Sequence, residues 1–287
     1  MSRRTGILLL LLAGVMWSLS GIAVKLADAP PLWFAGLRSL GAALVLLPMA
    51  LRNGGWPRGS VMGTCVVAHT VMVGTLIAAM TVGTAAQGIL LQYVGPVVCA
   101  LLGYALVGRT LRRNVRFGLI AAVVGVGVMV FADGVPSDFT PLLLGTASGL
   151  AYGSVIFLLE RIDAVTDGPV DAFKIVLLNN AGSAAVLLPI AAGVDAMPGV
   201  AVTVFILGVG VVQMAIPYVL FQHGIRTVVP VAAALIVLIE PVLNPTLVWA
   251  FHGEAMTVGT IIGGTVLLFA AGLAATGREP ATPPPAR

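Results

Sequence analysis

The chain has 287 residues, of which 59% are hydrophobic and 9% are charged, and its mean hydropathy is +1.07. Roughly a quarter of the residues in a soluble globular domain are charged, so this composition excludes a soluble core and indicates an integral membrane protein. The net charge of +4 is explained by basic loops on one side of a membrane, so no nucleic-acid partner is implied.

Apolar runs of membrane-spanning length follow one another along the chain. A helix needs roughly 20 residues to cross ~30 Å of hydrocarbon, which predicts about ten spans with little chain between them. Arg3 and Arg4 precede the first run, but no small-residue cleavage site follows, so we expect an uncleaved first helix and not a secretory signal. The expected spans are 6–27, 31–51, 60–80, 84–107, 115–132, 140–161, 170–191, 198–222, 228–251 and 256–276.

The distribution of charge between loops predicts the orientation. With the N-terminus in the cytoplasm, the loop arginines all fall on the cytoplasmic side, as the positive-inside rule requires. The sequence therefore predicts a multi-pass protein of the cytoplasmic (inner) membrane with both termini inside. We expect residues 278–287, which are polar and rich in proline, to form a disordered tail. The acidic residues of the other loops are Asp28, Asp133, Asp138, Asp195 and Glu254.

The two halves of the chain resemble each other weakly. Five helices per half is an odd number, so the second half enters the membrane from the opposite face and the repeat is inverted. Many transporters have this construction, with a substrate site near the midplane between the repeats; chance alignment of glycine-rich helices is the alternative. We expect repeats at 1–134 and 138–277. The matched positions are Gly14 with Gly149, Trp17 with Tyr152, Gly95-Pro96 with Glu240-Pro241, and Gly108 with Gly253.

Polar side chains recur near the middle of the spans. A charge at the centre of a membrane helix costs about 2.5–3.5 kcal/mol on insertion scales, so it normally faces a protein interior or a water-filled path. Eight helices carry such residues, whereas helices five and ten carry nothing more polar than threonine. The eight are therefore expected to surround a central cavity that binds substrate. Its predicted residues are Trp17, Ser18, Arg38, His69, Gln92, Tyr93, Tyr152, Asn179, Asn180, Gln213, Glu240 and Asn244.

Prolines mark the expected interruptions of the spans. Backbone groups that proline leaves unpaired need protein or water partners, so irregular backbone at membrane depth belongs beside a cavity. Pro96, Pro241 and Pro245 are therefore predicted to break their helices and to act in gating. Four further prolines stand at expected helix starts, where the missing N–H has no partner: Pro31, Pro141, Pro169 and Pro198.

Several roles stay open at this point. Glu240 either binds a substrate ammonium or a proton, or accepts hydrogen bonds from kinked backbone. Arg38 pairs either with a substrate carboxylate or with Glu240. His69 is either structural or linked to gating and protons. Trp17 and Tyr152 either form an aromatic wall of the site or fill the core.

Other features concern the surface. Lys25 is expected to extend to the outer surface, and Lys174 and Glu160 are expected near the inner one, paired or unpaired. Glycines on helices five and ten allow close helix contact, either within one subunit or in a homodimer through these two helices. The glycines are Gly118, Gly125, Gly127, Gly259 and Gly263.

Sequence motifs in both halves resemble the EamA-type transporters of the drug/metabolite transporter superfamily. They are IPY at 216–218, IEPVLNP at 239–245 and HGE at 252–254, matched by GVMWSLSGIAVK at 14–25 and YVGPVVCALLGYALVGR at 93–109. The resemblance covers nearly the whole chain. The glycine–proline pair of helix four beside the glutamate–proline pair of helix nine is similar to the amino-acid exporters of that superfamily, including aromatic-amino-acid exporters. Arg109 departs from the usual glutamate, so the resemblance implies no gating role there.

The sequence thus predicts a secondary exporter or facilitator of amino acids and related small metabolites, working by alternating access. The alternative is an exporter of other metabolites or of cationic drugs by proton antiport, although helix one lacks a mid-span acid for that exchange. ATP-driven transport is disfavoured because no Gly-x-x-x-x-Gly-Lys-[Ser/Thr] loop occurs.

An enzyme is not expected, since no nucleophile–base pair or carboxylate pair is present. Cys65 and Cys99 lie within spans without metal-ligand spacing, so no metal, cofactor or disulfide is expected.

Overall fold

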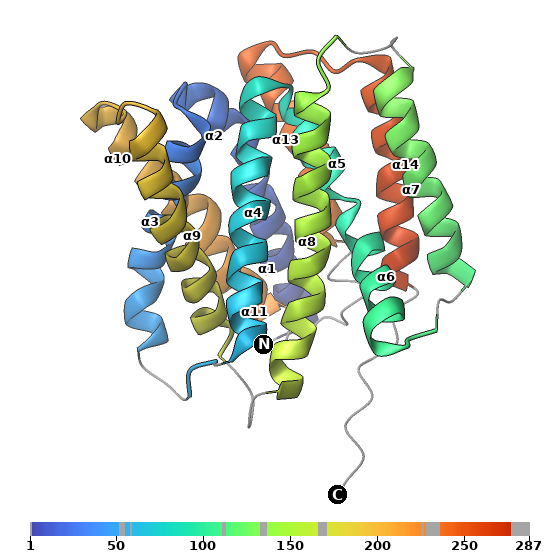
Figure 1. Cartoon of the computed structure of the whole chain (residues 1–287), viewed down its shortest axis with the longest axis horizontal. Coiled ribbons are helices and arrows are strands. Elements are labelled where there is room, and N and C mark those ends of the chain that lie inside the picture. Colours follow the sequence, from blue (N-terminus) through green and yellow to red (C-terminus); the bar gives the residue numbers. More distant parts are fainter. Residues whose placement is uncertain are drawn as a thin grey trace, which may run out of the picture.

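The computed structural model describes residues 2–51, 55–57, 59–110, 113–132, 137–165, 171–224, 227 and 236–276, and every regular element in these ranges is a helix (Figure 1). Eight segments are long and apolar enough to cross a membrane, and Val258–Leu273 is a shorter apolar helix. The ninth expected span, 228–251, lies partly outside the described residues. The prediction of an all-helical membrane protein is confirmed.

The helices of the first half are α1 (Arg3–Trp17), α2 (Ser20–Ala27), α3 (Pro31–Ala50), α4 (Ser60–Val82), α5 (Ala85–Gln92), α6 (Gly95–Val107) and α7 (Arg113–Phe131). Those of the second half are α8 (Thr140–Val165), α9 (Ala172–Val194), α10 (Val200–Gly210), the π-helical turn η1 (Val211–Ala215), α11 (Ile216–Gly224), the 3-10 turn η2 (Val237–Ile239), α13 (Glu240–His252) and α14 (Val258–Thr276).

The two halves run in opposite directions through the bundle. In Figure 1, α1 begins on the side where α14 ends, which we call the terminal face, whereas α8 begins on the other side, the opposite face. The C-terminal ends of the matched helices α6 and α13 have the same backbone conformation. Both helices end at a glycine in the left-handed region, Gly108 at φ 69° and Gly253 at φ 75°. Glycine adopts this conformation without steric penalty, so the inverted repeat is visible at single residues.

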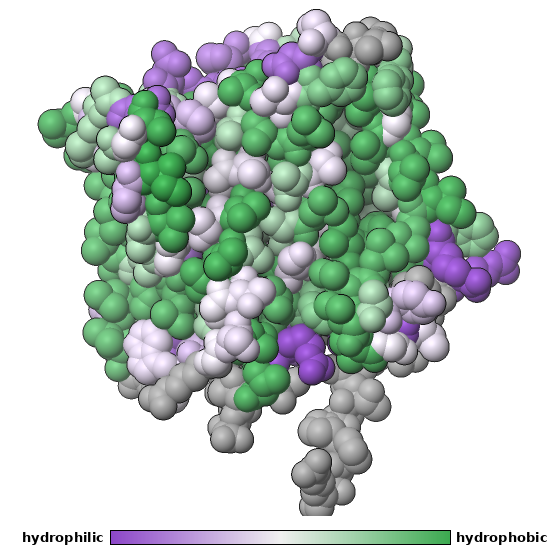
Figure 2. Space-filling view, in the orientation of Figure 1, coloured by the Kyte–Doolittle hydropathy of each residue, from purple (hydrophilic) through white to green (hydrophobic). Residues whose placement is uncertain are grey.

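Contacts between the halves follow the same symmetry. α3 packs along α9, its counterpart, and the contact of α4 with α9 is matched by that of α3 with α10. The surface over the middle of the bundle is hydrophobic and hydrophilic residues gather towards its ends (Figure 2). Large apolar side chains such as Val123, which is 74% exposed, form this lipid-facing surface.

α7 and α14 pack against each other beside the rest of the bundle (Figure 1). Their glycines make this possible, since a Cβ at Gly125 would lie 2.9 Å from the carbonyl oxygen of Gly263. Around Gly127, by contrast, a Cβ would meet no atom of the described residues within 4 Å. Gly125 and Gly263 therefore serve contact within one chain.

Several spans are interrupted near their middle. The fourth span divides between α5 and α6, and the ninth changes from η2 to α13; Pro96 and Pro241 are the second residues of the helices that begin there, as predicted. The prediction for Pro245 is wrong, because this proline lies inside α13, which continues to His252. The interruption of the first span at Ser18 and Leu19 was not predicted, since neither residue is a helix breaker.

The starts of the helices follow simple chemistry. Pro31 is the first residue of α3, and Pro141 is the second of α8. Hydrogen bonds from the Thr140 side chain and backbone lower the pKa of the Asp138 carboxyl at the start of α8. α10 begins only at Val200, after the predicted Pro198. Pro169 lies outside the described residues.

Candidate substrate site

Three interrupted helices meet inside the bundle. The Tyr93 hydroxyl, at the C-terminal end of α5, donates a hydrogen bond of 3.1 Å to Glu240 Oε2, at the first residue of α13. The Ser18 hydroxyl, between α1 and α2, lies 2.7 Å from the Gly14 carbonyl oxygen and 3.5 Å from that of Glu240. The interruptions of spans one, four and nine therefore bring polar groups to one place, as irregular backbone in a membrane requires.

Arg38 lies close to this meeting point. Its side chain on α3 is only 2% exposed, and its Nη1 donates to Gln213 Oε1 at 3.0 Å. Gln213 belongs to the π-helical turn η1, and its Nε2 donates to the Trp17 carbonyl oxygen at 3.2 Å. π-helical turns are frequent at functional sites, and this one aims a side-chain amide at both the arginine and the interrupted first span.

Arg38 and Glu240 interact electrostatically without direct pairing. Each contributes to the electrostatic environment of the other, yet the ion pairs found among the described residues do not include them. Of the two alternatives left open for Arg38, a direct ion pair with Glu240 is therefore not formed in this conformation. The Arg38 Nε is buried and has no hydrogen-bond partner among the described residues, which leaves a donor for another group.

Aromatic rings stand beside the charged groups. The Trp17 ring lies 5.4 Å from the Tyr218 ring, edge to face, and 5.5 Å from the Phe221 ring. Tyr152, the counterpart of Trp17, lies against the α6 start, where a Cβ at Gly95 would meet its ring. Three side chains at mid-span positions are only partly buried: Trp17, Tyr152 and Glu240.

Two predicted residues are held by neighbouring helices. His69 Nδ1 on α4 lies 2.9 Å from the Ser183 hydroxyl on α9, which also contacts Thr70 Oγ1 at 3.0 Å. Gln92 Nε2 donates to the Ser148 hydroxyl on α8 at 3.1 Å, and Ser148 donates to the Met72 carbonyl oxygen at 3.0 Å. These bonds join helices to one another, so they favour the structural alternative for His69.

Three buried asparagines each leave an oxygen unused. Asn244 Nδ2 donates to Ser20 Oγ at 2.6 Å, Asn180 Nδ2 to the Val176 carbonyl at 2.9 Å, and Asn179 Nδ2 lies 3.8 Å from Cys65 Sγ. The Oδ1 atoms of all three are buried and have no hydrogen-bond partner in the described part of the chain. Buried polar atoms are normally satisfied, so these acceptors point to sites for water or a ligand.

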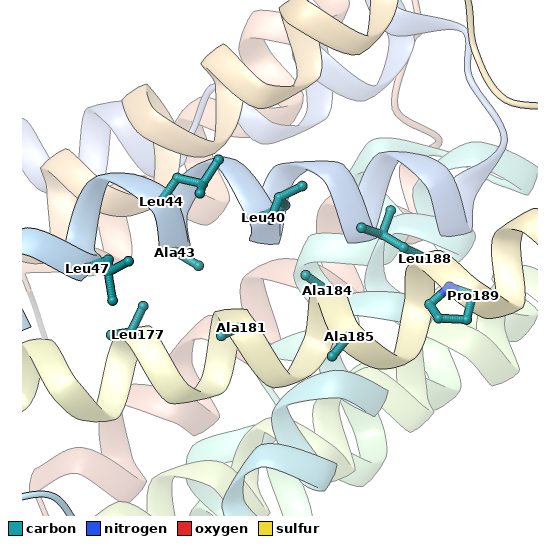
Figure 3. A pocket seen from close by; sticks show the side chains of 10 residues that line it. All are labelled: Leu40, Ala43, Leu44, Leu47, Leu177, Ala181, Ala184, Ala185, Leu188 and Pro189. Atoms are coloured by element: carbon teal, nitrogen blue, oxygen red, sulfur yellow. The ribbon is translucent and has the colours of Figure 1, made fainter.

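An apolar groove lies away from these polar side chains. It has a volume of about 490 Å³, lies between α3 and α9, and is lined by leucines, alanines and one proline (Figure 3). None of the twelve predicted site residues lines it. Nine of the twelve are buried in the interior, so the predicted polar site and this apolar groove are different places.

Both halves of the chain match the model of the EamA-like transporter family, over residues 4–131 and 139–276. The chain belongs to this family. It is also 28% identical over 267 residues to an uncharacterized transporter of Archaeoglobus fulgidus, covering 92% of this chain and 94% of the relative. A protein of known crystal structure superposes with a TM-score of 0.64 at 18% identity, over 95% of this chain and 97% of the other. This last similarity bears on the fold alone.

Membership identifies the chain as a multi-pass membrane transporter and not an enzyme. In many transporters built from inverted repeats, the substrate site lies near the midplane at the repeat interface, beside discontinuous helices. The described side chains offer a guanidinium, a carboxylate, amides and aromatic rings there, and no group of three or more His, Cys, Asp or Glu that could hold a metal ion occurs among the residues searched.

Some members of this site were missed by the sequence. Ser20, Ser148 and Ser183 supply the hydrogen-bond partners of Asn244, Gln92 and His69. A serine inside an apolar run does not by itself indicate a contact between helices, because its hydroxyl can also bond to the backbone of its own helix. Tyr218 was visible in the IPY motif, but its edge-to-face contact with Trp17 could not be predicted from the sequence.

Proposed function

We propose that this EamA-like transporter carries amino acids, aromatic ones included, across the cytoplasmic membrane by alternating access, as a secondary exporter or facilitator. One observation carries the proposal: Arg38 and Glu240 bring opposite charges into a single buried polar cluster without neutralising each other directly. A zwitterion offers a carboxylate to the first and an ammonium to the second.

The neighbours of the two charges support this reading. Gln213 and Tyr93 orient the guanidinium and the carboxylate through one hydrogen bond each. Each hydrogen bond to a charged group contributes roughly 1.5–3 kcal/mol. A substrate that lacks the carboxylate or the ammonium would therefore lose one such bond and bind less tightly. The rings of Trp17, Tyr218 and Phe221 form an apolar wall that suits an aromatic side chain.

The orientation belongs to the same proposal. The terminal face carries Arg3, Arg4, Arg109, Arg113 and Arg161, whereas Asp28, Asp138, Asp195 and Glu254 lie at the opposite face. The positive-inside rule then puts the terminal face in the cytoplasm, so that export runs from the terminal to the opposite face.

The test compares the entry of radiolabelled tryptophan into proteoliposomes with the competing effect of three related molecules. Radiolabelled tryptophan should enter vesicles faster with the purified full chain than without it. Unlabelled phenylalanine should compete, whereas tryptamine, which lacks the carboxylate, and indole-3-propionate, which lacks the ammonium, should compete at least about tenfold less well because each forfeits a charge-assisted hydrogen bond.

Two variants connect the result to the residues. Glu240→Gln should lose discrimination against indole-3-propionate more than against tryptamine, while Arg113→Gln, at the bundle surface over Phe117, should behave like the unchanged protein. Competition by tryptamine alone would instead support the transport of cations. No acceleration for any member of a broad amino-acid panel would refute the proposal.

A further inference from the structure

Two ion pairs tie the halves of the molecule together, one at each face. At the opposite face, Lys25 Nζ lies 2.7 Å from Glu254 Oε2; at the terminal face, Arg109 Nη1 lies 2.7 Å from Glu160 Oε2. Each pair joins the first span of one repeat to the end of the fourth span of the other. Both pairs therefore cross the boundary along which the repeats would move.

The two pairs are equivalent under the repeat. Lys25 follows Trp17 by eight residues, and Glu160 follows the matched Tyr152 by eight residues. Arg109 directly follows the helix-ending Gly108, as Glu254 directly follows the matched Gly253. The signs are exchanged, since the base is on the first span in one pair and on the fourth in the other.

The pairs differ in how firmly they are built. Lys25 Nζ also donates to the Gly83 carbonyl at 3.0 Å, and Glu254 Oε1 accepts from the Ala85 N–H at 2.7 Å, so this pair also holds the turn between α4 and α5. Its side chains are 15% and 18% exposed, against 47% and 31% for Arg109 and Glu160. Exposed ion pairs contribute little, whereas a partly buried pair with further hydrogen bonds resists separation more strongly.

We propose that Lys25–Glu254 and Arg109–Glu160 are equivalent latches that open alternately, and that the firmer Lys25–Glu254 latch keeps the opposite face closed at rest while the terminal face opens more readily. Alternating access requires that the repeats part at one face at a time, and the inference rests on the proposed transport function. These four residues act by positioning the repeats and do not contact substrate.

The experiment reports opening without requiring transport. A Ser18→Cys reporter, buried in the polar cluster, is introduced into a Cys65→Ser/Cys99→Ser background of the full chain. A membrane-impermeant methanethiosulfonate reagent is then applied to intact cells and to inside-out vesicles. Lys25→Gln or Glu254→Gln should raise the labelling rate from the opposite face about tenfold or more, whereas Arg109→Gln or Glu160→Gln should raise it from the terminal face by a smaller factor, about twofold to fivefold.

Matched variants separate a latch from general damage. The charge-swapped pair Lys25→Glu/Glu254→Lys should return the labelling rate towards that of the reporter parent, and Lys25→Gln/Glu254→Gln should exceed neither single variant, because the two residues act as one unit. Asp138→Asn removes a charge from the same face outside the latch and should change nothing. Unchanged labelling in the single variants, or an equal increase from both faces, would overturn the proposal.

The outcome is independent of the amino-acid assignment. If tryptophan is not transported but the single variants open the expected faces, the substrate proposal fails and the latches stand. If tryptophan is transported and labelling does not respond, the latches fail and the substrate proposal stands.

Discussion

Gln213 shows how one buried side chain joins separate parts of the site. Its amide oxygen accepts from Arg38 and its amide nitrogen donates to the Trp17 carbonyl that the interrupted first span leaves free. An amide suits this position because it offers an acceptor and a donor at once. Gln213 therefore couples the position of the guanidinium to the shape of the first span.

Gln213→Leu should lower the free energy of unfolding by about 2–4 kcal/mol, because it leaves a buried guanidinium N–H and a buried carbonyl without partners. Thermal unfolding in detergent measures the effect. The matched control is Thr265→Val, which removes a bond between an exposed side chain and its own helix. Equal stability of the two variants would show that water replaces Gln213.

Much of the residue-level site could be predicted by position along each span. Counting from the ends of an apolar run predicted Tyr93, Glu240, Arg38 and Gln213, which the structure links in two hydrogen-bonded pairs. It could not predict which pairs form, since partners lie on helices distant in sequence. Arg38 bonds to the Gln213 amide and not to Glu240 because the π-helical turn η1 places that amide beside it. No sequence pattern in this chain predicts the turn.

At the scale of helices, glycine decides how closely α7 and α14 approach. A Cβ at Gly263 would lie 2.5 Å from the Gly125 carbonyl oxygen and 2.5 Å from Met129 Cγ. Added atoms in such a close contact force the helices apart. Gly127, on the same helix as Gly125, has no such neighbour.

Gly263→Ala should therefore destabilise the protein by about 1–3 kcal/mol. Gly127→Ala should stabilise it by up to about 1 kcal/mol, because alanine restricts the unfolded chain and favours helix. Unfolding of both variants in detergent, followed by circular dichroism, gives the comparison. The same sign for both would mean that the α7–α14 contact does not depend on the glycine.

Helices were predictable where their signals are local. Apolar length gave the spans, proline in the first turn gave the starts of α3 and α8, and the mid-span prolines Pro96 and Pro241 marked where α6 and α13 begin. The break predicted at Pro245 is absent because neighbouring groups can satisfy the backbone around a proline inside a membrane helix, and α13 continues past this residue. At the break near Ser18, Gln213 of η1 donates to the Trp17 carbonyl and Ser18 lies within 3.5 Å of the Glu240 carbonyl on α13, contacts between segments far apart in the sequence.

For the whole molecule, the orientation in the membrane gives a direct prediction. Ser60 and Ser137 are both exposed. Ser60 is the first residue of α4, which begins at the terminal face, and Ser137 comes three residues before α8, which begins at the opposite face (Figure 1). In a Cys65→Ser/Cys99→Ser background, Ser137→Cys should react with an impermeant maleimide added to intact cells, and Ser60→Cys only after the membrane is opened. The reverse pattern would place the terminal face outside and contradict the positive-inside assignment.

The two repeats do not have identical shapes. The first span is split into α1 and α2, whereas its counterpart α8 runs unbroken from Thr140 to Val165. Likewise, the eighth span contains η1, whereas its counterpart α4 is continuous from Ser60 to Val82. An exchange of conformations between the repeats would convert this molecule into its reciprocal form: α8 would divide beside Tyr152, α4 would gain a wider turn, and α1 and α2 would fuse into one rod. In the proposed alternating-access cycle, the asymmetry between the repeats would be reversed in this way.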